Sequence, residues 1–175
     1  MDTERRLIER VGKGDEDAFG ELVGRYGARL LAVAGRLLGS RADAEDAVQR
    51  ALLHCFANAS RYRADWAVST WLYRILTNIC VDELRRRSIR AARDRMLPMM
   101  TRSRDGQPDA YLDLHRALDR VPREARVLLA LRYVDGLSYG ELARIRGISV
   151  NTVKSQLARG KTLLRTALAE RGAPK

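Results

Sequence analysis

The hydrophobic and polar positions of this chain alternate with the period of a helix over most of its length. In the first long segment, large apolar residues recur every three or four positions, which places them on one face of a helix. These residues are Phe19, Leu22, Tyr26, Leu30, Val33 and Leu37. Gly39 is expected to end this helix, and Ser40 to cap a second helix that runs to about Ala59.

A third helix is expected from about Val68 to Arg87, after a polar stretch at residues 60–67. Its apolar side carries Leu72, Ile75, Leu76, Ile79 and Leu84. No segment alternates with the two-residue period of a strand, and no Asn-Gly pair marks a hairpin turn. The pattern therefore predicts an all-α protein.

The apolar period disappears between residues 88 and 110, where Pro98 and the Gly106-Gln107-Pro108-Asp109 stretch indicate a loop. Structureless loops of this length are uncommon inside a compact domain. We therefore predict a flexible linker at 88–110 between two small helical domains, residues 1–87 and residues 111–175. An irregular loop within a single domain is the alternative interpretation.

The sequence of the C-terminal part predicts a second set of helices. Pro122 suits the first turn of a helix, and Asp135-Gly136 is expected to end that helix. The stretch from Ser138 to Glu141 has the spacing of a capping box, in which the two side chains each satisfy a free backbone N–H. The short helix that follows ends at Gly147, and Ser149 is expected to cap the last helix.

A helix, a glycine-containing turn and a basic second helix form the pattern of a helix-turn-helix. The apolar residues that would hold the two helices together are Leu142, Ile148, Val150, Val153, Leu157, Leu164 and Leu168. Polar and basic side chains near the start of the second helix suit base edges in the major groove of DNA. The candidate duplex-binding residues are Ser149, Asn151, Thr152, Lys154, Ser155, Gln156, Arg159 and Lys161. An ordinary amphipathic helical hairpin is the alternative.

The charge of the chain supports a DNA-binding helix-turn-helix over an ordinary helical hairpin. Lys and Arg total 33 and Asp and Glu total 22, which gives a net charge of +11. From Arg144 to Arg165 there are six bases and no acid. This distribution suggests that the C-terminal part binds a polyanion, with a solvated basic surface as the alternative.

A second set of candidate binding residues lies on the helix expected from Val68. Five of its residues share a narrow stripe opposite the apolar side, and the preceding loop contributes four more. A tryptophan exposed beside asparagine and arginine could stack on unpaired bases and bind them by hydrogen bonds. The candidate single-strand-binding residues are Arg61, Tyr62, Arg63, Trp66, Trp71, Arg74, Asn78, Asp82 and Arg85. The alternative is a core tryptophan with a solvated run of arginines at the helix end.

Other classes of protein are not favoured. No apolar run approaches the roughly 20 residues that span a bilayer, so neither membrane insertion nor secretion is expected. Cys55 and Cys80 lack CxxC spacing, which favours a reducing cytoplasm and buried structural thiols. His54 and His115 are the only other soft ligands, so no metal site is expected. Without a glycine-rich phosphate loop or a nucleophile–base pair, we expect neither a cofactor nor an enzyme activity.

Both sets of candidate residues occur in the order that is typical of one family. The chain resembles the extracytoplasmic-function (ECF) group of bacterial RNA polymerase sigma factors. Asp17-Ala18-Phe19 and Ala42 to Gln49 resemble the first conserved segment and the polymerase-docking segment, and Thr70 to Arg74 resembles the segment that opens and reads the downstream promoter element. The C-terminal domain of the family is matched by Leu118 to Pro122, Gly136 to Tyr139, Glu141 to Ala143, Gly147 to Ser149 and Thr152 to Ser155.

The resemblance implies a cytoplasmic sigma factor that binds core RNA polymerase and directs initiation through the −10 and −35 promoter elements, the first as single strand and the second as duplex. Docking is expected on Asp43, Glu45, Asp46 and Gln49, because acids at a helix start suit a basic partner. An anti-sigma protein is expected as a further partner. A stand-alone duplex-binding regulator and a sigma mimic that binds only regulatory proteins are the alternatives.

The chain departs from the family pattern at three positions. Arg50 stands where an acid is usual, Val68 where a phenylalanine is usual, and Phe56 where a tryptophan is usual. The predicted linker of 23 residues could reach roughly 80 Å, and promoter elements about two turns apart lie roughly 70 Å from one another. Two linked domains could therefore read both elements.

Overall fold

The computed structural model describes residues 2–63, 65–94 and 109–172, which form helices and short connections with no strand among them. The all-α prediction is confirmed. The N-terminal helical group comprises α1 (Asp2–Gly12), α2 (Glu16–Leu38), α3 (Arg41–Asn58), the short 3-10 helix η1 (Ala59–Arg61) and α4 (Val68–Asp94). The C-terminal helical group comprises α5 (Asp109–Leu118), α6 (Arg123–Val134), α7 (Tyr139–Arg146) and α8 (Val150–Gly172).

The helix ends follow local signals, and the sequence predicted most of them. Gly39 ends α2 with a left-handed φ of 68°, and Gly147 ends α7 with a φ of 66°. The Ser40 side chain accepts a hydrogen bond from the backbone N–H at the start of α3. Ser138 and the glutamate three positions on form the predicted capping box. Ser149 caps α8 with its hydroxyl, which accepts a hydrogen bond from the backbone N–H of Thr152.

One helix was not predicted, and another extends beyond its predicted end. The start of the chain, α1, shows too much alternating charge to predict a helix, yet it buries Leu7, Ile8 and Val11. Helix α4 runs to Asp94 and not to Arg87, because alanines and arginines favour helix even without an apolar stripe. Residues 88–94 and 109–110 of the predicted linker are thus helical, and residues 95–108 lie outside the described part of the chain.

The N-terminal helical group packs around α2, which contacts α1, α3 and α4. In the C-terminal helical group, α8 lies across α5, α6 and α7. The buried face of α8 differs from the prediction, since Val150 is 39% exposed and Leu168 is 40% exposed, whereas Gly160 and Ala167 are buried. An α-helix has 3.6 residues per turn, so the residues on the same face as Val153 include residue 167, whereas residue 168 lies at the edge of that face.

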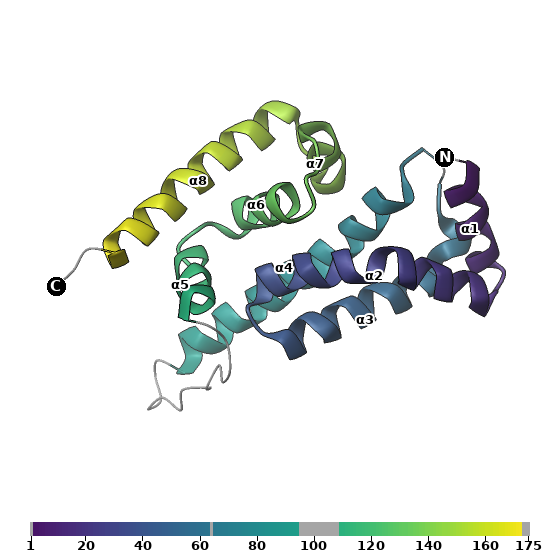
Figure 1. The fold of residues 1–175 in the computed structure, drawn as a ribbon, viewed down its shortest axis with the longest axis horizontal. Coiled ribbons are helices and arrows are strands. Elements are labelled where there is room, and N and C mark those ends of the chain that lie inside the picture. Colours follow the sequence, from purple (N-terminus) through teal and green to yellow (C-terminus); the bar gives the residue numbers. More distant parts are fainter. Residues whose placement is uncertain (1, 64, 95–108, 173–175) are drawn as a thin grey trace.

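The two groups pack directly against each other. Helix α6 contacts α2 and α4, and α7 contacts α4, so that α6 lies between α8 and the N-terminal helices (Figure 1). Their buried apolar residues form one continuous cluster. The surfaces described below therefore belong to a closed arrangement of both groups.

Candidate polymerase and nucleic-acid interfaces

The predicted docking residues lie together on the first turns of α3. Glu45, Asp46 and Gln49 are exposed and Asp43 is half-buried. Each of the three acids already pairs with an arginine of this chain. The pairs are Asp43–Arg87 at 2.6 Å, Glu45–Arg41 at 2.8 Å and Asp46–Arg50 at 3.4 Å. A basic partner that docks here competes with these internal pairs.

The predicted single-strand face lies along α4 and the loop before it. Asn78, Asp82 and Arg85 are exposed on the same side of the helix. Trp71 is half-buried and not exposed as predicted, because Tyr62, which follows η1, packs on it. Its ring packs on the ring of Tyr62, with centroids 5.3 Å apart.

The loop and helix together build an aromatic platform at the N-terminal end of α4. The guanidinium of Arg74 lies 4.8 Å from the ring centroid of Trp66, a cation–π distance. The Tyr62 hydroxyl donates to the backbone carbonyl of Trp66, and burial raises the pKa of Tyr62. Trp66 keeps 36% of its surface exposed and is the aromatic face best placed to stack on a base. Arg61 and Arg63, on either side of Tyr62 in the sequence, are exposed.

The helix-turn-helix places its polar face at the start of α8. The residues Ser149, Asn151, Lys154, Ser155, Arg159 and Lys161 are exposed, while Thr152 and Gln156 are half-buried. Two hydroxyls have local roles: the Thr152 hydroxyl lies 2.8 Å from that of Ser149, and the Ser155 hydroxyl donates to the Thr152 carbonyl. Asn151, Lys154 and Arg159 are the exposed long or amide side chains near the start of α8 that can reach a base edge or a phosphate.

The capping box stabilises the start of α7. Glu141 accepts hydrogen bonds from both the backbone N–H and the hydroxyl of Ser138, at 2.8 and 2.6 Å. The hydrogen bonds from the Ser138 side chain and backbone hold the pKa of Glu141 below its usual value of 4.5. The carboxylate is thus ionised at neutral pH and stabilises the start of α7.

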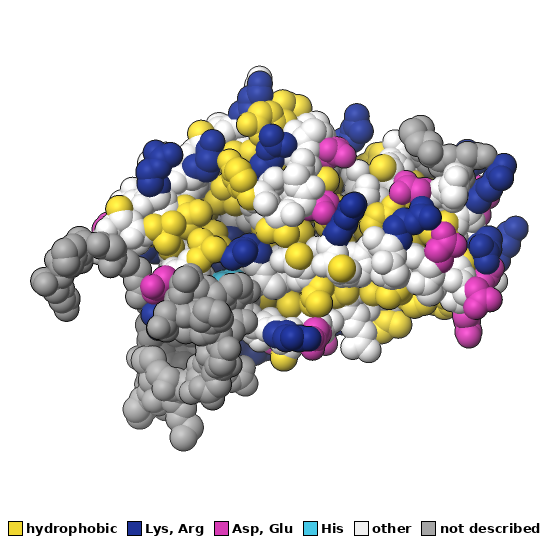
Figure 2. Space-filling model, viewed as in Figure 1, with side chains coloured by type: hydrophobic (Ala, Val, Ile, Leu, Met, Phe, Trp, Pro, Cys, Tyr) yellow, Lys and Arg dark blue, Asp and Glu magenta, His cyan; other side chains and the backbone are white. Residues whose placement is uncertain are grey.

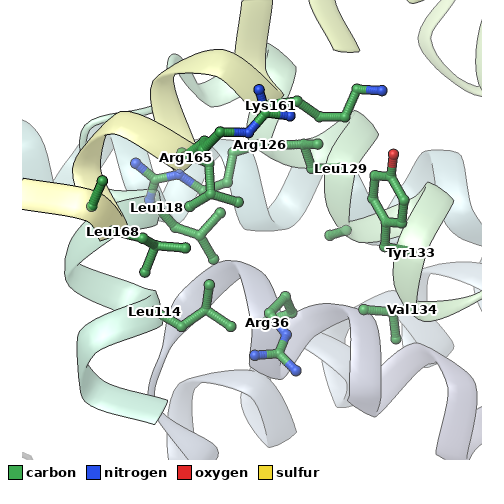
Figure 3. Close-up of a pocket in the computed structure, with 13 residues that line it drawn as sticks. Arg36, Leu114, Leu118, Arg126, Leu129, Tyr133, Val134, Lys161, Arg165 and Leu168 are labelled. Atoms are coloured by element: carbon green, nitrogen blue, oxygen red, sulfur yellow. The ribbon is translucent and has the colours of Figure 1, made fainter. Parts of the chain in front are cut away.

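An apolar groove of about 830 Å³, which the sequence did not predict, opens between α5, α6 and α8. Figure 3 shows Leu114, Leu118 and Leu129 in this groove, with Arg36 of α2 and Lys161 of α8 beside them. Lys161 thus lies at the groove and away from the start of α8. Figure 2 shows exposed apolar atoms between basic side chains on this side of the molecule.

Tyr133 and Leu168 give the groove its exposed apolar edge, with 64% and 40% of their surfaces accessible. A second apolar hollow of about 500 Å³, on α2 and α3, shares Arg36 and Val134 with it. The two hollows together cross from one helical group to the other. Large apolar side chains off the predicted core face are the signal that could have revealed them.

The two cysteines of the chain are buried structural residues. Cys55 and Cys80 are free and buried, and burial raises the pKa of each thiol to about 12. Across residues 2–63, 65–94 and 109–172, no three His, Cys, Asp or Glu side chains gather in a way that could hold a metal ion. In the same part of the chain, no helix combines the length and apolar character needed to cross a bilayer.

Comparison with known proteins identifies two sigma-factor regions in the chain. The family model of Sigma-70 region 2 matches residues 22–89, and that of Sigma-70, region 4 matches residues 111–164. The ECF RNA polymerase sigma factor SigW of Bacillus subtilis (strain 168) is 32% identical over 181 residues, covering 95% of this chain and 97% of the relative. SigM of Mycobacterium tuberculosis is 35% identical over 164 residues, covering 93% of this chain and 83% of the relative.

Solved structures share the fold. CnrH in complex with the cytosolic domain of CnrY has a TM-score of 0.72 at 24% identity, covering 97% of this chain and 99% of the other. The sigma factor RpoE in complex with the anti-sigma factor NepR from Bartonella quintana has a TM-score of 0.68 at 24% identity, covering 86% and 96%.

Regions 2 and 4 in this order define a sigma factor of the Sigma-70 class. Within that class, the chain belongs to the ECF RNA polymerase sigma factors. It therefore directs promoter-specific transcription initiation by RNA polymerase.

Proposed function

We propose that the two helical groups divide the work of promoter recognition. In this proposal, residues 1–87 dock on core polymerase through α3 and hold the opened strand of the −10 element on α4. Residues 111–175 read the −35 element as duplex through α8, and residues 88–110 link the two parts. Polymerisation chemistry belongs to core polymerase in the cytoplasm, where we also place this protein.

The observation that carries the proposal is the pair of polar faces on separate helical groups. The exposed Asn78 and Arg85 lie on α4, whose N-terminal end carries an aromatic platform that suits unpaired bases. The exposed Asn151 and Arg159 lie near the capped start of α8, the geometry that suits a major groove. Two readers on two groups fit a promoter with two separated elements.

Run-off transcription with purified core polymerase and a promoter library tests this proposal. We expect the protein to bind duplex DNA weakly by itself and to make core polymerase start at promoters with two sequence blocks about two helical turns apart. Strong, sequence-specific binding of an operator by the free protein, with no effect on core polymerase, would favour a stand-alone regulator.

We also propose an anti-sigma partner that docks in the apolar groove and spans both helical groups. The groove has leucines at its floor and Arg36, Lys161 and Arg165 around it, which suits an amphipathic helix with acidic flanks. Two structurally similar proteins were solved in complexes, CnrH with the cytosolic domain of CnrY and RpoE with the anti-sigma factor NepR. Co-purification from the native cell under non-inducing conditions, comparing wild type with Leu168→Asp, is the test. We expect a small protein that is captured by wild type and lost with the variant, and the absence of such a protein would contradict the partner.

A further inference from the structure

A cavity of about 620 Å³ lies between the second half of α4 and the turn that joins α5 to α6. Among the described residues, its charged lining consists of four arginines and one acid, which are Arg87, Arg120, Arg123, Arg126 and Asp119. None of the predicted DNA-binding or docking residues is part of the lining that the structure describes. The excess of arginines makes this cavity a candidate anion site, separate from the surfaces described above.

Arg126 of α6 carries a buried N–H group that lacks an acceptor. Its side chain is 7% exposed, and its two terminal nitrogens donate to the Asp119 carboxylate at 3.0 Å and to the Val121 carbonyl at 3.3 Å. Both acceptors line the cavity, so the guanidinium lies at the cavity wall. In the described part of the chain, its third donor, Nε, has no hydrogen-bond partner. A buried donor without an acceptor is costly, and a bound anion would supply the acceptor.

The start of α6 borders the same cavity and is also unsatisfied. Its N-cap residue is Pro122, and no side chain caps the backbone N–H groups of residues 123–125. The acid of the first turn, Glu124, pairs with Arg146 of α7 at 2.6 Å. Arg123 instead places a positive charge at the positive end of the helix dipole. An anion bound at this helix start would offset both charges and accept from the free N–H groups.

Two of the arginines would reach an anion from opposite walls. Arg87 of α4 donates to the Leu38 carbonyl at 2.8 Å and lies 2.6 Å from the Asp43 carboxylate, so its position is fixed. Arg123 is exposed, and none of the described acids pairs with it. Burial lowers the pKa of Arg126, and the charge of Arg123 adds to this effect while Asp119 opposes it. The positive charges of α6 are therefore close enough to repel each other, and an anion between them would relieve this repulsion.

The cavity is larger than inorganic phosphate alone requires. Its volume falls within the range of about 300–1,000 Å³ that is typical of small-molecule sites. The apolar side chains of Leu38, Leu84 and Val121 form part of its wall. A ligand that fits this cavity therefore carries its anionic group on a larger, partly apolar body.

We propose that this cavity binds the phosphate group of a small phosphorylated molecule, with Arg123, the Nε of Arg126 and the free N–H groups at the start of α6 as donors. A phosphate monoester has three terminal oxygens and up to two negative charges, so it can accept from all these donors at once. A phosphodiester of a nucleic acid has two such oxygens and one charge. The site therefore favours a small monoester over a nucleic-acid backbone.

NMR of the arginine side chains of the full-length protein measures binding directly. The probes are inorganic phosphate, adenosine 5′-monophosphate and dimethyl phosphate, a model diester, at constant ionic strength. Arg126→Lys removes one Nε–H signal and thereby assigns it. We expect inorganic phosphate and the monophosphate to shift the Nε signals of Arg126 and Arg123, and dimethyl phosphate to bind at least roughly tenfold more weakly.

Arg123→Gln is the decisive variant, because an exposed side chain without an ion pair can change without loss of folding. Arg116→Gln is the matched control, since it removes the same charge from an exposed arginine of α5 outside the cavity. We expect the Kd for adenosine 5′-monophosphate to rise roughly ten- to a hundredfold in Arg123→Gln and to stay within about twofold in the control. At 100-fold its Kd, the monophosphate should raise the Tm of wild type by roughly 5–10 °C.

Three results would overturn the proposal. The first is an Nε signal of Arg126 that does not move with any probe. The second is equal affinity of Arg123→Gln and Arg116→Gln, which would mean binding to the basic surface in general. The third is dimethyl phosphate that binds as tightly as the monophosphate, together with displacement of the monophosphate by a duplex oligonucleotide, which would assign the cavity to a nucleic-acid backbone. The comparison of Kd values stands without Arg126→Lys, which serves only to assign the signal.

Discussion

Asp46 and Arg50 face each other one turn apart on α3, with 3.4 Å between the guanidinium and the carboxylate. Arg50 stands where the ECF pattern usually has an acid. Arg50 therefore neutralises part of the negative charge of the docking face, where the usual acid would add to it. Since both side chains are exposed, the pair itself contributes little to stability, and its effect falls on docking.

Reversing the charge at Asp46 should weaken assembly with core polymerase. We expect Asp46→Arg to associate roughly three- to tenfold more slowly at low salt, with the difference shrinking as salt screens the charges. Arg50→Gln is the matched variant and should associate faster, because it releases Asp46. Stopped-flow binding at two ionic strengths is the measurement. Normal association of Asp46→Arg, with unchanged helical content, would refute the docking assignment.

Two glycines in the same conformation provide a matched test of the closed packing. Gly39 and Gly147 both end helices with left-handed φ, but a Cβ meets the imidazole of His115 at the first and nothing within 4 Å at the second. Alanine at Gly147 should cost about 1–2 kcal/mol for the backbone alone. Alanine at Gly39 should lower the melting temperature further and expand the molecule. Equal effects at the two glycines, measured by calorimetry and scattering, would mean that α5 does not pack there in solution.

The capping box should give α7 a pH-dependent stability. Hydrogen bonds from Ser138 lower the pKa of Glu141 in the folded protein, so the stabilisation is present above the usual pKa of 4.5. It is lost as pH falls through the folded value. We expect Glu141→Gln to be less stable than wild type at pH 7, with a gap of about 0.5–2 kcal/mol that closes below pH 4. A gap in urea denaturation that stays constant from pH 7 to below pH 4 would argue against an ionised cap.

The two thiols should be inert in the native protein. Raising the pKa from 9.0 to about 12 lowers the thiolate fraction of Cys55 and Cys80 about 1000-fold at pH 8, and burial blocks access as well. A thiol reagent at pH 8 should therefore modify both cysteines only after urea is added. Rapid modification of the native protein would place at least one thiol at the surface.

The features that the sequence predicted are local in the chain. Gly39, Ser40, Ser138 and Gly147 end or cap helices through bonds to residues within four positions, so spacing alone identifies them. The stripe on α4 was predicted for the same reason.

The features that the sequence did not predict arise from contacts between distant segments. Tyr73 and Asp135 are 62 positions apart, and a sequence pattern assigns Asp135 only the role of ending a helix. The partial burial of Trp71 depends on the packing of Tyr62 from the segment before α4, and the apolar groove exists only where α8 lies over α5 and α6. Periodicity reports which face of a helix is apolar, but it does not report what covers that face.

The division of labour between the two helical groups is tested most directly by Arg159→Ala and Asn78→Ala. Footprinting and transcription with core polymerase are measured on a double-stranded promoter and on the same promoter with its −10 element already melted. Arg159→Ala should lose upstream binding, since a major-groove contact of this kind is worth roughly 1–3 kcal/mol, and the melted template should not restore its activity. Asn78→Ala should keep the upstream footprint and fail at the opened strand. Failure of both variants at the same step, with the same response to the melted template, would contradict the account.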